Sequence, residues 1–347
     1  MNSNNPPVFI GGTRQQRQSR VIGGDYVHLL NEPYYKISNY DAMEPFFMSL
    51  VSSSNHWMFI ASTGGLSAGR VNADHALFPY YTVDKLTENF ENTGAKSVLI
   101  IEREGRKSLW EPFSDRQRGI YDVERNLYKN IPGSTLIFEE INHDLKLTYR
   151  YAWRTGDTFG FVKSSWLTNH AAFPCQVELL DGLQNLLPAN VSAQTQNTFS
   201  PLLDAYKKNE LDEATGLAVY SLNSQLTDLA EPSESLLATV AWQVGLEAEG
   251  FLLSSQQLDA FRSGERVHIE TETRGRRGAY FAHAVFSLRA DEERAWHVVA
   301  DVDQDAAEVV RLTRLLRGDA QTLIASLETD VAANTSNLEE IVASADG

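Results

Sequence analysis

The stretch LKLTYRYAWRTGDTFGFVKSSWLTNHAAFPCQVELLDGLQNLLP, residues 145–188, decides the fold. Apolar and polar residues alternate over 145–154, which is the period-two pattern of a strand with one buried face. Gly156-Asp157 predicts a turn, and the aromatic and β-branched run 159–167 predicts a second strand before a longer polar turn. A third strand is predicted from 175 to 180. We therefore expect three consecutive antiparallel strands, whose apolar face needs a second sheet to cover it.

Length and composition restrict the class of protein. The 347 residues are 42% hydrophobic and carry a formal net charge of −16, which disfavours nucleic acid or an anionic membrane as a partner and leaves neutral sugars open. No run approaches the roughly eighteen apolar residues of a membrane span, and the N-terminal segment lacks the apolar core of a signal peptide. The single cysteine, Cys175, excludes an internal disulfide, so we expect a cytoplasmic protein.

Changes in composition and period divide the chain into three predicted segments. Residues 1–19 are polar and rich in Asn, Gln, Pro and Gly, which predicts a flexible arm. A β domain is predicted over 20–303, with a helical insertion near 200–215 that would begin at Ser200-Pro201 and run to about residue 214. From 304 to 347 the hydrophobic period becomes about 3.6, which predicts helices.

The fold class that follows is mainly β, a large antiparallel two-sheet β-sandwich with a C-terminal helical linker. Beyond the central stretch, alternation and turn signals predict strands at 26–30, 46–52, 56–62, 97–103, 107–110, 134–141, 217–223, 236–245, 266–273, 279–288 and 296–302, and a short helix at 255–262. The segment 67–89 is predicted to be an ordered but irregular aromatic loop.

The C-terminal helices carry apolar stripes that nothing else in the chain was expected to cover. We predict that these side chains are exposed, that the chain is cut short, and that it either self-associates or has a frayed tail. The residues concerned are Val309, Val310, Leu315, Leu316, Leu323 and Leu327.

Several short motifs occur in a recognisable order. They are Gly69-Arg70-Val71-Asn72 followed by Leu77-Phe78-Pro79-Tyr80, then Leu109-Trp110-Glu111-Pro112, Leu167-Thr168-Asn169 and Glu178-Leu179-Leu180-Asp181. In this order they resemble the N-terminal domain of the cellobiose phosphorylase group of glycoside phosphorylases, glycoside hydrolase family ninety-four, over roughly residues 37–305. Two departures, Val123-Glu124-Arg125-Asn126 and Tyr80, leave the donor sugar and the choice between phosphorolysis and hydrolysis open.

The resemblance implies a β-sandwich, then linker helices, then an (α/α)₆ barrel that holds the catalytic acid and the phosphate site. Because that barrel is not in this sequence, we expect a non-catalytic N-terminal domain that turns over nothing alone. In such enzymes it contributes to the pocket for β-glucan-type oligosaccharides, partners the missing catalytic domain and belongs to a homodimer. The alternative is a free-standing carbohydrate-binding module.

The aromatic loop is the best candidate for a sugar-binding rim. Aromatic faces stack on sugar C–H surfaces, while Arg, Asn and Asp bond the hydroxyl groups. The alternative is that these aromatic residues are core, which we accept for Trp57, Trp153, Trp166, Trp242 and Trp296 inside strand patterns. The candidate carbohydrate-binding residues are Arg70, Asn72, Asp74, Tyr80, Tyr81 and Trp110.

Other motifs favour structural interpretations. Residues 65–69 match the G-x-S-x-G nucleophile elbow but lack a following helix, so a hairpin end is preferred. The eight histidines have no metal-ligand spacing, and we expect neither a metal nor a cofactor. The pairs Glu139-Glu140 and Glu292-Glu293 are interpreted as solvated charge rather than an acid and base pair. Arg274, Arg276 and Arg277 around Gly275 could hold phosphate or form a solvated hairpin tip.

Overall fold

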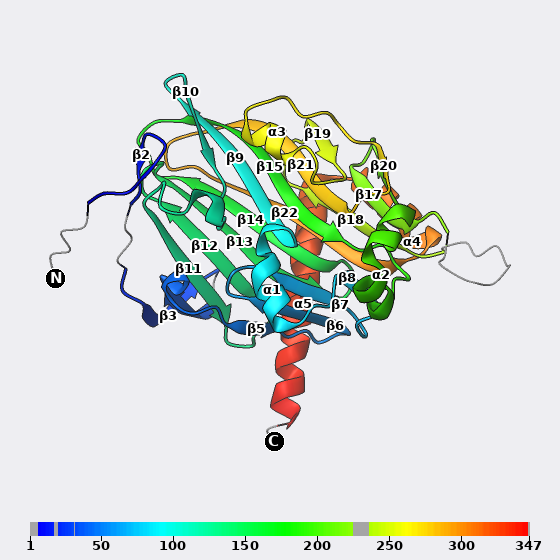
Figure 1. Ribbon diagram of the computed structural model, residues 1–347. Helices are drawn as coiled ribbons and strands as arrows, with labels where there is room; N and C mark the ends of the chain where they lie inside the picture. The colour runs from blue at the N-terminus through cyan, green and yellow to red at the C-terminus, as the bar shows by residue number, and fades with distance from the viewer. Residues whose placement is uncertain (1–5, 17–19, 31, 225–235, 346–347) are drawn as a thin grey trace.

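A computed structural model describes residues 6–16, 20–30, 32–224 and 236–345. These residues form two β layers with helices on their outer sides (Figure 1). The first layer is an 11-stranded antiparallel sheet. Its spatial order is β20 Glu272–Arg274, β16 Lys207–Asp212, β17 Leu217–Leu222, β18 Ala238–Val244, β22 Glu293–Gln304, β14 Gly160–Asn169, β13 Leu147–Gly156, β12 Leu136–Asn142, β11 Val123–Asn130, β4 Glu32–Ser38 and β3 Gly23–Leu29.

Two smaller antiparallel sheets make the second layer of the described structure. The five-stranded sheet has the order β10 Arg106–Trp110, β9 Gly94–Arg103, β15 Cys175–Leu186, β21 Gly278–Leu288 and β19 Gly250–Leu252. The four-stranded sheet has the order β5 Phe47–Leu50, β6 His56–Ala61, β7 Leu66–Arg70 and β8 Ala76–Phe78. This arrangement confirms the mainly β, antiparallel sandwich predicted from the sequence.

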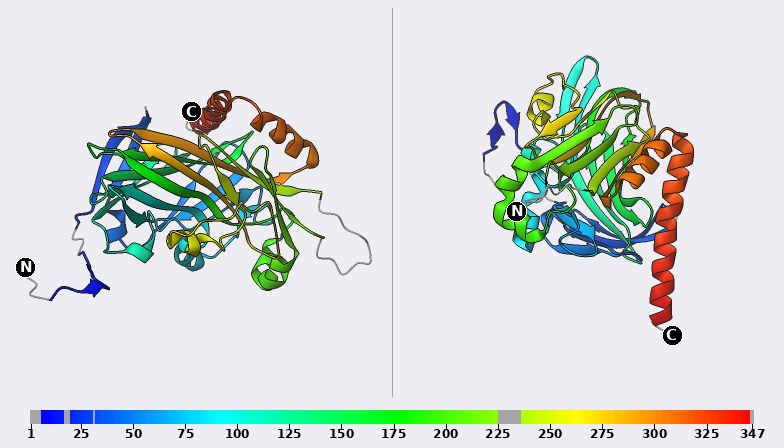
Figure 2. Two further views of the ribbon diagram at one scale, coloured as in Figure 1. Left: turned by 90° about the horizontal axis from the view of Figure 1, so that it is seen from above. Right: turned by 90° about the vertical axis from the view of Figure 1, so that its right-hand side faces the viewer.

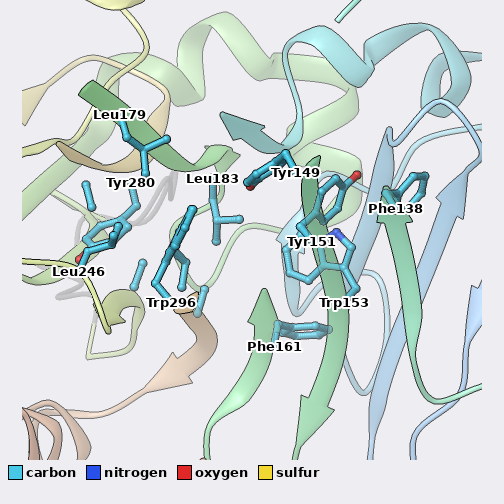
Figure 3. Close-up of a cluster of buried hydrophobic side chains, with 14 of the residues drawn as sticks. Phe138, Tyr149, Tyr151, Trp153, Phe161, Leu179, Leu183, Leu246, Tyr280 and Trp296 are labelled. Carbon is cyan, nitrogen blue, oxygen red and sulfur yellow. The ribbon is translucent and has the colours of Figure 1, made fainter. Parts of the chain in front are cut away.

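The main core lies between the two layers (Figure 3). Strand β13 contributes Tyr149, Tyr151 and Trp153 from one face, as its alternation predicted. Phe138 stacks on Tyr151 with ring centroids 5.0 Å apart, and Leu179 of β15 comes from the opposite layer. Burying aromatic rings of this size removes a large apolar area from water, so this core is the main stabilising element of the fold.

The third strand of the central stretch lies in a different sheet from the first two. β13 and β14 pair antiparallel as predicted, but β15 pairs with β9 and β21 in the five-stranded sheet. The predicted three-stranded meander is therefore wrong at its last step. β15 is itself part of the second sheet that the apolar face of β13 and β14 requires.

Eight helical segments belong to the described residues: η1 Tyr40–Ala42, α1 Val83–Glu88, η2 Asn89–Glu91, η3 Asp115–Gln117, α2 Ala193–Tyr206, α3 Leu258–Arg262, α4 Ala306–Leu316 and α5 Ala320–Ala345. Helices α4 and α5 lie against the 11-stranded sheet, on the side opposite to α1 and α2 (Figure 2). Leu312, Leu323 and Leu327 are buried there against Val240 and Trp242 of β18. The predicted exposed stripe is therefore wrong, because the outer face of the large sheet covers most of it. Val310 alone of the six named residues is half exposed.

Four other sequence predictions differ from the structure. The helical insertion is α2, whose N-cap is Ser192, and residues 207–212 form strand β16 rather than more helix. Within 67–89 the chain forms β7, β8 and α1 instead of an irregular loop. Within the predicted arm, described residues include a small hairpin, β1 Phe9–Ile10 and β2 Thr13–Arg14, while 1–5 and 17–19 lie outside the described residues. Of the segment predicted as a strand, 266–273, only residues 272 and 273 belong to one, β20.

Candidate functional site

Trp110 lies in the core and not at a surface rim. Its side chain is 1% exposed, and its indole N–H donates to Glu140 Oε1 at 2.7 Å. A ring in this position cannot stack on a sugar without unpacking the sandwich. The expectation of a rim position for Trp110 is therefore wrong, because a polar partner 30 residues away in sequence satisfies its N–H inside the fold.

Three further candidates, Arg70, Asn72 and Asp74, make contacts within the fold. The Arg70 guanidinium makes a two-pronged ion pair with Asp301, with Nε–Oδ1 at 2.7 Å and Nη2–Oδ2 at 2.8 Å. Asn72 Oδ1 accepts from the Asp74 backbone N–H, and Asp74 Oδ1 accepts from the Ala193 N–H at the start of α2. Burial raises the pKa of Asp301, although the hydrogen bonds and charge of Arg70 oppose that shift. These contacts join β7 to β22 and to α2.

The two adjacent tyrosines differ in their surroundings. Tyr80 is 45% exposed and packs edge-on against Trp57 and Phe59. The backbone N–H of Tyr81 donates to Ser67 Oγ at 3.1 Å, and the residue lines a pocket. Of the six candidates, Tyr81 alone lines this pocket.

The pocket beside Tyr81 has a volume of about 480 Å³ and a mostly polar lining. It lies where the α1–η2 segment, the end of β15, α2 and the β20–β21 turn meet, and Figure 1 shows α1 and α2 on the same side of the molecule. Besides Tyr81, the wall consists of Asn89, Asn92, Thr93, Gln184, Asn185, Asp204, Ser254, Ser255, Gln256, Gly275, Arg276 and Arg277. Sequence reasoning missed most of these residues, because they come from five separate segments of the chain.

A β-bulge in β15 places two amide side chains in this wall. The register of β15 against β21 shifts between Gln184 and Leu186, and Asn185 has a left-handed backbone with φ 61°. Asn tolerates this conformation better than most residues, and bulges commonly redirect side chains next to functional sites. Gln184 Nε2 donates to the Glu91 carbonyl at 2.7 Å, and Asn185 Nδ2 donates to Thr93 Oγ1 at 2.9 Å. The two side-chain oxygens are therefore oriented by fixed neighbours.

Two arginines from the β20–β21 turn complete the pocket. Arg277 Nε donates to Asp204 Oδ2 at 3.1 Å, and Lys207 donates to Asp204 Oδ1 at 2.7 Å. Burial, the largest influence, favours the neutral acid, but hydrogen bonds and charge from Lys207 and Arg277 lower the pKa of Asp204 overall. The Gln256 side-chain oxygen, turned towards Arg276, accepts from its Nε at 3.2 Å and Nη1 at 2.9 Å. Because β20 and β21 belong to different sheets, this turn is not the predicted hairpin tip.

The other sequence motifs are structural. Ser67 of the G-x-S-x-G match is buried within β7, where its Oγ donates to the Pro79 carbonyl at 2.6 Å, so it is not an exposed nucleophile. Glu139 and Glu140 are both buried, which corrects the expectation of solvated charge. Glu139 accepts from Tyr128 at 2.7 Å, and Glu140 pairs with Arg125 at 2.8 Å.

A second cavity, of about 570 Å³, lies between α5 and the outer face of the large sheet, where strands β4, β13, β14 and β22 contribute to its wall. Its central polar groups already bond one another. Arg154 makes a two-pronged ion pair with Glu328 at 2.7 Å for each contact, and His297 Nδ1 lies 2.8 Å from Ser164 Oγ. The pocket beside Tyr81 is therefore the better candidate, because it presents groups without such partners. Among the described residues, no partner is found for the side-chain amides of Asn89 and Asn92.

The described part of the chain contains no group of three or more His, Cys, Asp or Glu side chains placed to hold a metal ion. The same residues contain no helix that is both long and apolar enough to cross a membrane.

Comparisons with known proteins show structural likeness at low identity. No protein-family model and no curated protein matches the sequence. A protein from the human microbiome assigned as a kojibiose phosphorylase gives a TM-score of 0.42 at 12% identity, over 88% of this chain and 37% of its own. A bacterial glucoamylase complexed with acarbose gives 0.41 at 8% identity, over 86% and 38%. A protein from Klebsiella pneumoniae assigned as an aldose 1-epimerase gives 0.33 at 10% identity, over 86% and 93%.

These neighbours are carbohydrate-active enzymes by name. The chain spans less than two fifths of the length of the phosphorylase and of the glucoamylase.

Proposed function

We propose that this chain is a carbohydrate-binding β-sandwich domain that binds an oligosaccharide in the pocket beside Tyr81. The observation that carries the proposal is the lining itself. One aromatic ring stands among amide, hydroxyl and guanidinium groups in a concave space of about 480 Å³. Pockets of a few hundred cubic ångströms suit small ligands, and this volume suits one or two sugar rings.

The chemistry of the lining suits a sugar better than an apolar ligand. A sugar hydroxyl both donates and accepts a hydrogen bond, and the amides of Asn89, Asn92 and Asn185 offer both kinds of group. The Tyr81 ring offers an apolar face for the C–H side of a pyranose. Fixed neighbours hold Gln184 and Asn185, so little conformational entropy is lost when they bind a ligand.

The same lining supports binding rather than hydrolysis. Most glycosidases use two carboxyl groups about 5 to 10 Å apart across the bond that breaks. Within the described lining, Asp204 is the sole carboxylate, and Lys207 and Arg277 already bond both of its oxygens. We therefore propose a non-catalytic role within a larger enzyme that acts on β-glucan-type oligosaccharides, by phosphorolysis or hydrolysis. The order of the sequence motifs supports this role.

The partners we propose are a separate catalytic domain and a second copy of the chain. The end of α5 projects beyond the sandwich (Figure 2), and Ile341 and Val342 on it are each 54% exposed. Apolar side chains on a projecting helix favour contact with another folded surface. Light scattering at several concentrations tests the dimer. A mass that stays at one chain at every concentration would exclude it.

The binding proposal is tested by titrating neutral gluco-oligosaccharides against the wild type and a matched pair of variants. Tyr81→Ala removes the aromatic face from the pocket, and Tyr80→Ala removes the neighbouring ring outside it. We expect millimolar affinity, about 4 kcal/mol, that Tyr81→Ala abolishes and Tyr80→Ala leaves unchanged. Equal losses in both variants, or no binding by the wild type, would contradict the proposal.

A further inference from the structure

The strand turn at the pocket mouth carries two positive charges in a chain whose formal net charge is −16. Arg276 and Arg277 are both exposed there. Among the described residues, no carboxylate lies within ion-pair distance of the Arg276 guanidinium, which is held by the neutral amide of Gln256. Arg277 uses only its Nε on Asp204, and its two terminal nitrogens have no partner in the described structure.

The local balance of charge is therefore positive. Asp204 is the single carboxylate of the lining, and it faces Arg277 and the buried Lys207 at once. Arg276 remains as an uncompensated charge at the edge of an otherwise neutral wall. The neighbouring Arg274, by contrast, pairs with Glu272 at 2.6 Å.

We infer that the pocket binds an acidic sugar, one that carries a carboxylate or a phosphate, and that Arg276 and Arg277 hold this anionic group. The inference rests on the proposed sugar site and names its ligand class. A guanidinium presents a planar fork of N–H donors that matches two oxygens of a carboxylate or phosphate. Gln256 and Asp204 restrain the two guanidinium groups, so both forks are oriented before a ligand arrives.

The amide groups of the pocket would then bond the neutral hydroxyls of the same sugar. Gln184 and Asn185 come from the β15 bulge, and the arginines come from the β20–β21 turn, so the two walls recognise different parts of one ligand. Neither wall alone distinguishes an acidic sugar from a neutral sugar or from a free anion. Binding of the acidic sugar should therefore exceed that of either component.

The test uses four probes with the full chain: glucose, glucuronate, glucose 6-phosphate and inorganic phosphate. Affinities are measured by NMR titration at low and high salt. Arg276→Gln and Arg277→Gln remove the proposed anion contacts, and Arg276→Lys keeps the charge without the fork. Arg274→Gln is the matched control, because Arg274 is the last residue of β20, next to the turn but outside the pocket lining. Thermal melts check that each variant is folded.

We expect at least one acidic sugar to bind about tenfold more tightly than glucose, with added salt removing most of the difference. Arg276→Gln should abolish this preference, and Arg274→Gln should keep it. Comparing glucuronate with glucose 6-phosphate identifies the anionic group. If Arg277→Gln lowers the stability of the fold, the sugar affinities of Arg276→Gln alone test whether the arginines hold the anionic group.

Three outcomes would overturn the inference, and they separate it from the sugar site itself. Equal binding of glucose and both acidic sugars would leave a neutral sugar site. If inorganic phosphate binds as tightly as glucose 6-phosphate, the pocket is an anion site to which the sugar contributes no affinity. No binding of any probe or of neutral oligosaccharides would remove the sugar site as well.

Discussion

The buried Asp181 carboxylate accepts four hydrogen bonds between the two sheets. Its Oδ1 accepts from Lys163 Nζ at 2.5 Å, from Ser97 Oγ at 2.5 Å and from the Tyr149 hydroxyl at 3.0 Å. Its Oδ2 accepts from Trp296 Nε1 at 2.7 Å. Burial, the largest influence, lowers the pKa of Lys163, although the neighbouring Asp181 opposes that shift. The network ties β14 of one sheet to β15 of the other.

Lys163→Met should destabilise the protein strongly. It leaves the Asp181 carboxylate buried without its cation, which costs about 3 to 5 kcal/mol. The double variant Lys163→Met with Asp181→Leu should cost less than the two single changes added together, because neither charge is then left alone. Lys208→Met is the control, since Lys208 pairs with Glu210 at the surface and such pairs contribute about 0 to 1 kcal/mol. Urea unfolding compares these four variants with the wild type. Equal losses of unfolding free energy in Lys163→Met and Lys208→Met would refute the buried ion pair.

His297 gives the fold a pH dependence of known sign. Burial, reinforced by the charge of Arg154, lowers the pKa of His297 to about 4, below the value of about 6.5 for an unfolded histidine. Between these two pH values the unfolded chain binds a proton that the folded chain does not. The stability contributed by the neutral ring is therefore complete above about pH 6.5 and falls as the pH drops towards 4.

This fall should amount to about 3 kcal/mol for His297. Replacing it with Gln, which can still bond Ser164, should make the fall in unfolding free energy between pH 6.5 and 4 smaller. Part of the fall should remain, because burial also lowers the pKa of His56, to about 3. The control is His143→Gln, whose side chain is 44% exposed. Urea titrations at half-unit pH steps measure both variants. The same slope in wild type and His297→Gln would contradict this account.

At the scale of elements, α5 shows how a long helix is held on a sheet. Its first half buries Leu323, Leu327 and Val331 against the outer face of the 11-stranded sheet. Glu328 pairs there with Arg154, and Asp330 accepts the backbone N–H groups at 158 and 159. Further along, Leu338 is the last buried residue of the helix, so the remaining turns have little sheet to contact.

Leu327→Ala should therefore lower the free energy of unfolding by about 2 to 5 kcal/mol, because it leaves a cavity under the helix. Val342→Ala, at a half-exposed position of the same helix, should change it by less than about 0.5 kcal/mol. Chemical denaturation compares the two. If both variants change the free energy of unfolding by similarly small amounts, α5 does not pack on the sheet through Leu327.

Local patterns in the sequence predicted where strands and helices lie better than they predicted which strands pair with each other. The alternation in β13 and the turn at Gly156 are local signals, and the β13–β14 pairing followed from them. The alternation of β15 says nothing of which strand it pairs with, so its place in the other sheet could not be predicted. Ser200-Pro201 resembles a helix start, but Ser192 is the N-cap and Pro201 lies inside a helix with a kink at Phe199.

The candidate site shows the same limit more strongly. Tyr81 was predicted from a local cluster of aromatic residues, whereas Gln184 and Asn185 reach the pocket only because β15 bulges there. A bulge depends on the register of two strands about 95 residues apart, which no local pattern records. Trp110 was misplaced for the related reason that its partner, Glu140, lies in the facing sheet.

In the whole molecule, the helices on the two sides of the sandwich have different surroundings. Helices α4 and α5 cover the outer face of the large sheet, while α1 and α2 border the polar pocket on the opposite side (Figure 2). A ligand in the pocket would contact loops from both the second layer and the edge of the first. The rigid core between the layers fixes the distances among those loops.

This arrangement predicts that the chain binds sugar without cleaving it. Incubation of the purified chain with gluco-oligosaccharides and phosphate should release no sugar-1-phosphate and no shorter sugar. The reason is that the single carboxylate of the described lining is occupied by two cations. Turnover that persists after repeated purification would contradict a purely binding role.

Sugar binding at the pocket beside Tyr81 is tested by mapping where sugar binds on the folded chain, from NMR chemical-shift changes on titration with neutral and acidic gluco-oligosaccharides. We expect the largest changes at the side-chain and backbone amides of Asn92, Asn185 and Gln256, in the lining of this pocket. Changes confined to the opposite side, at α5, or none at saturating sugar, would contradict this expectation.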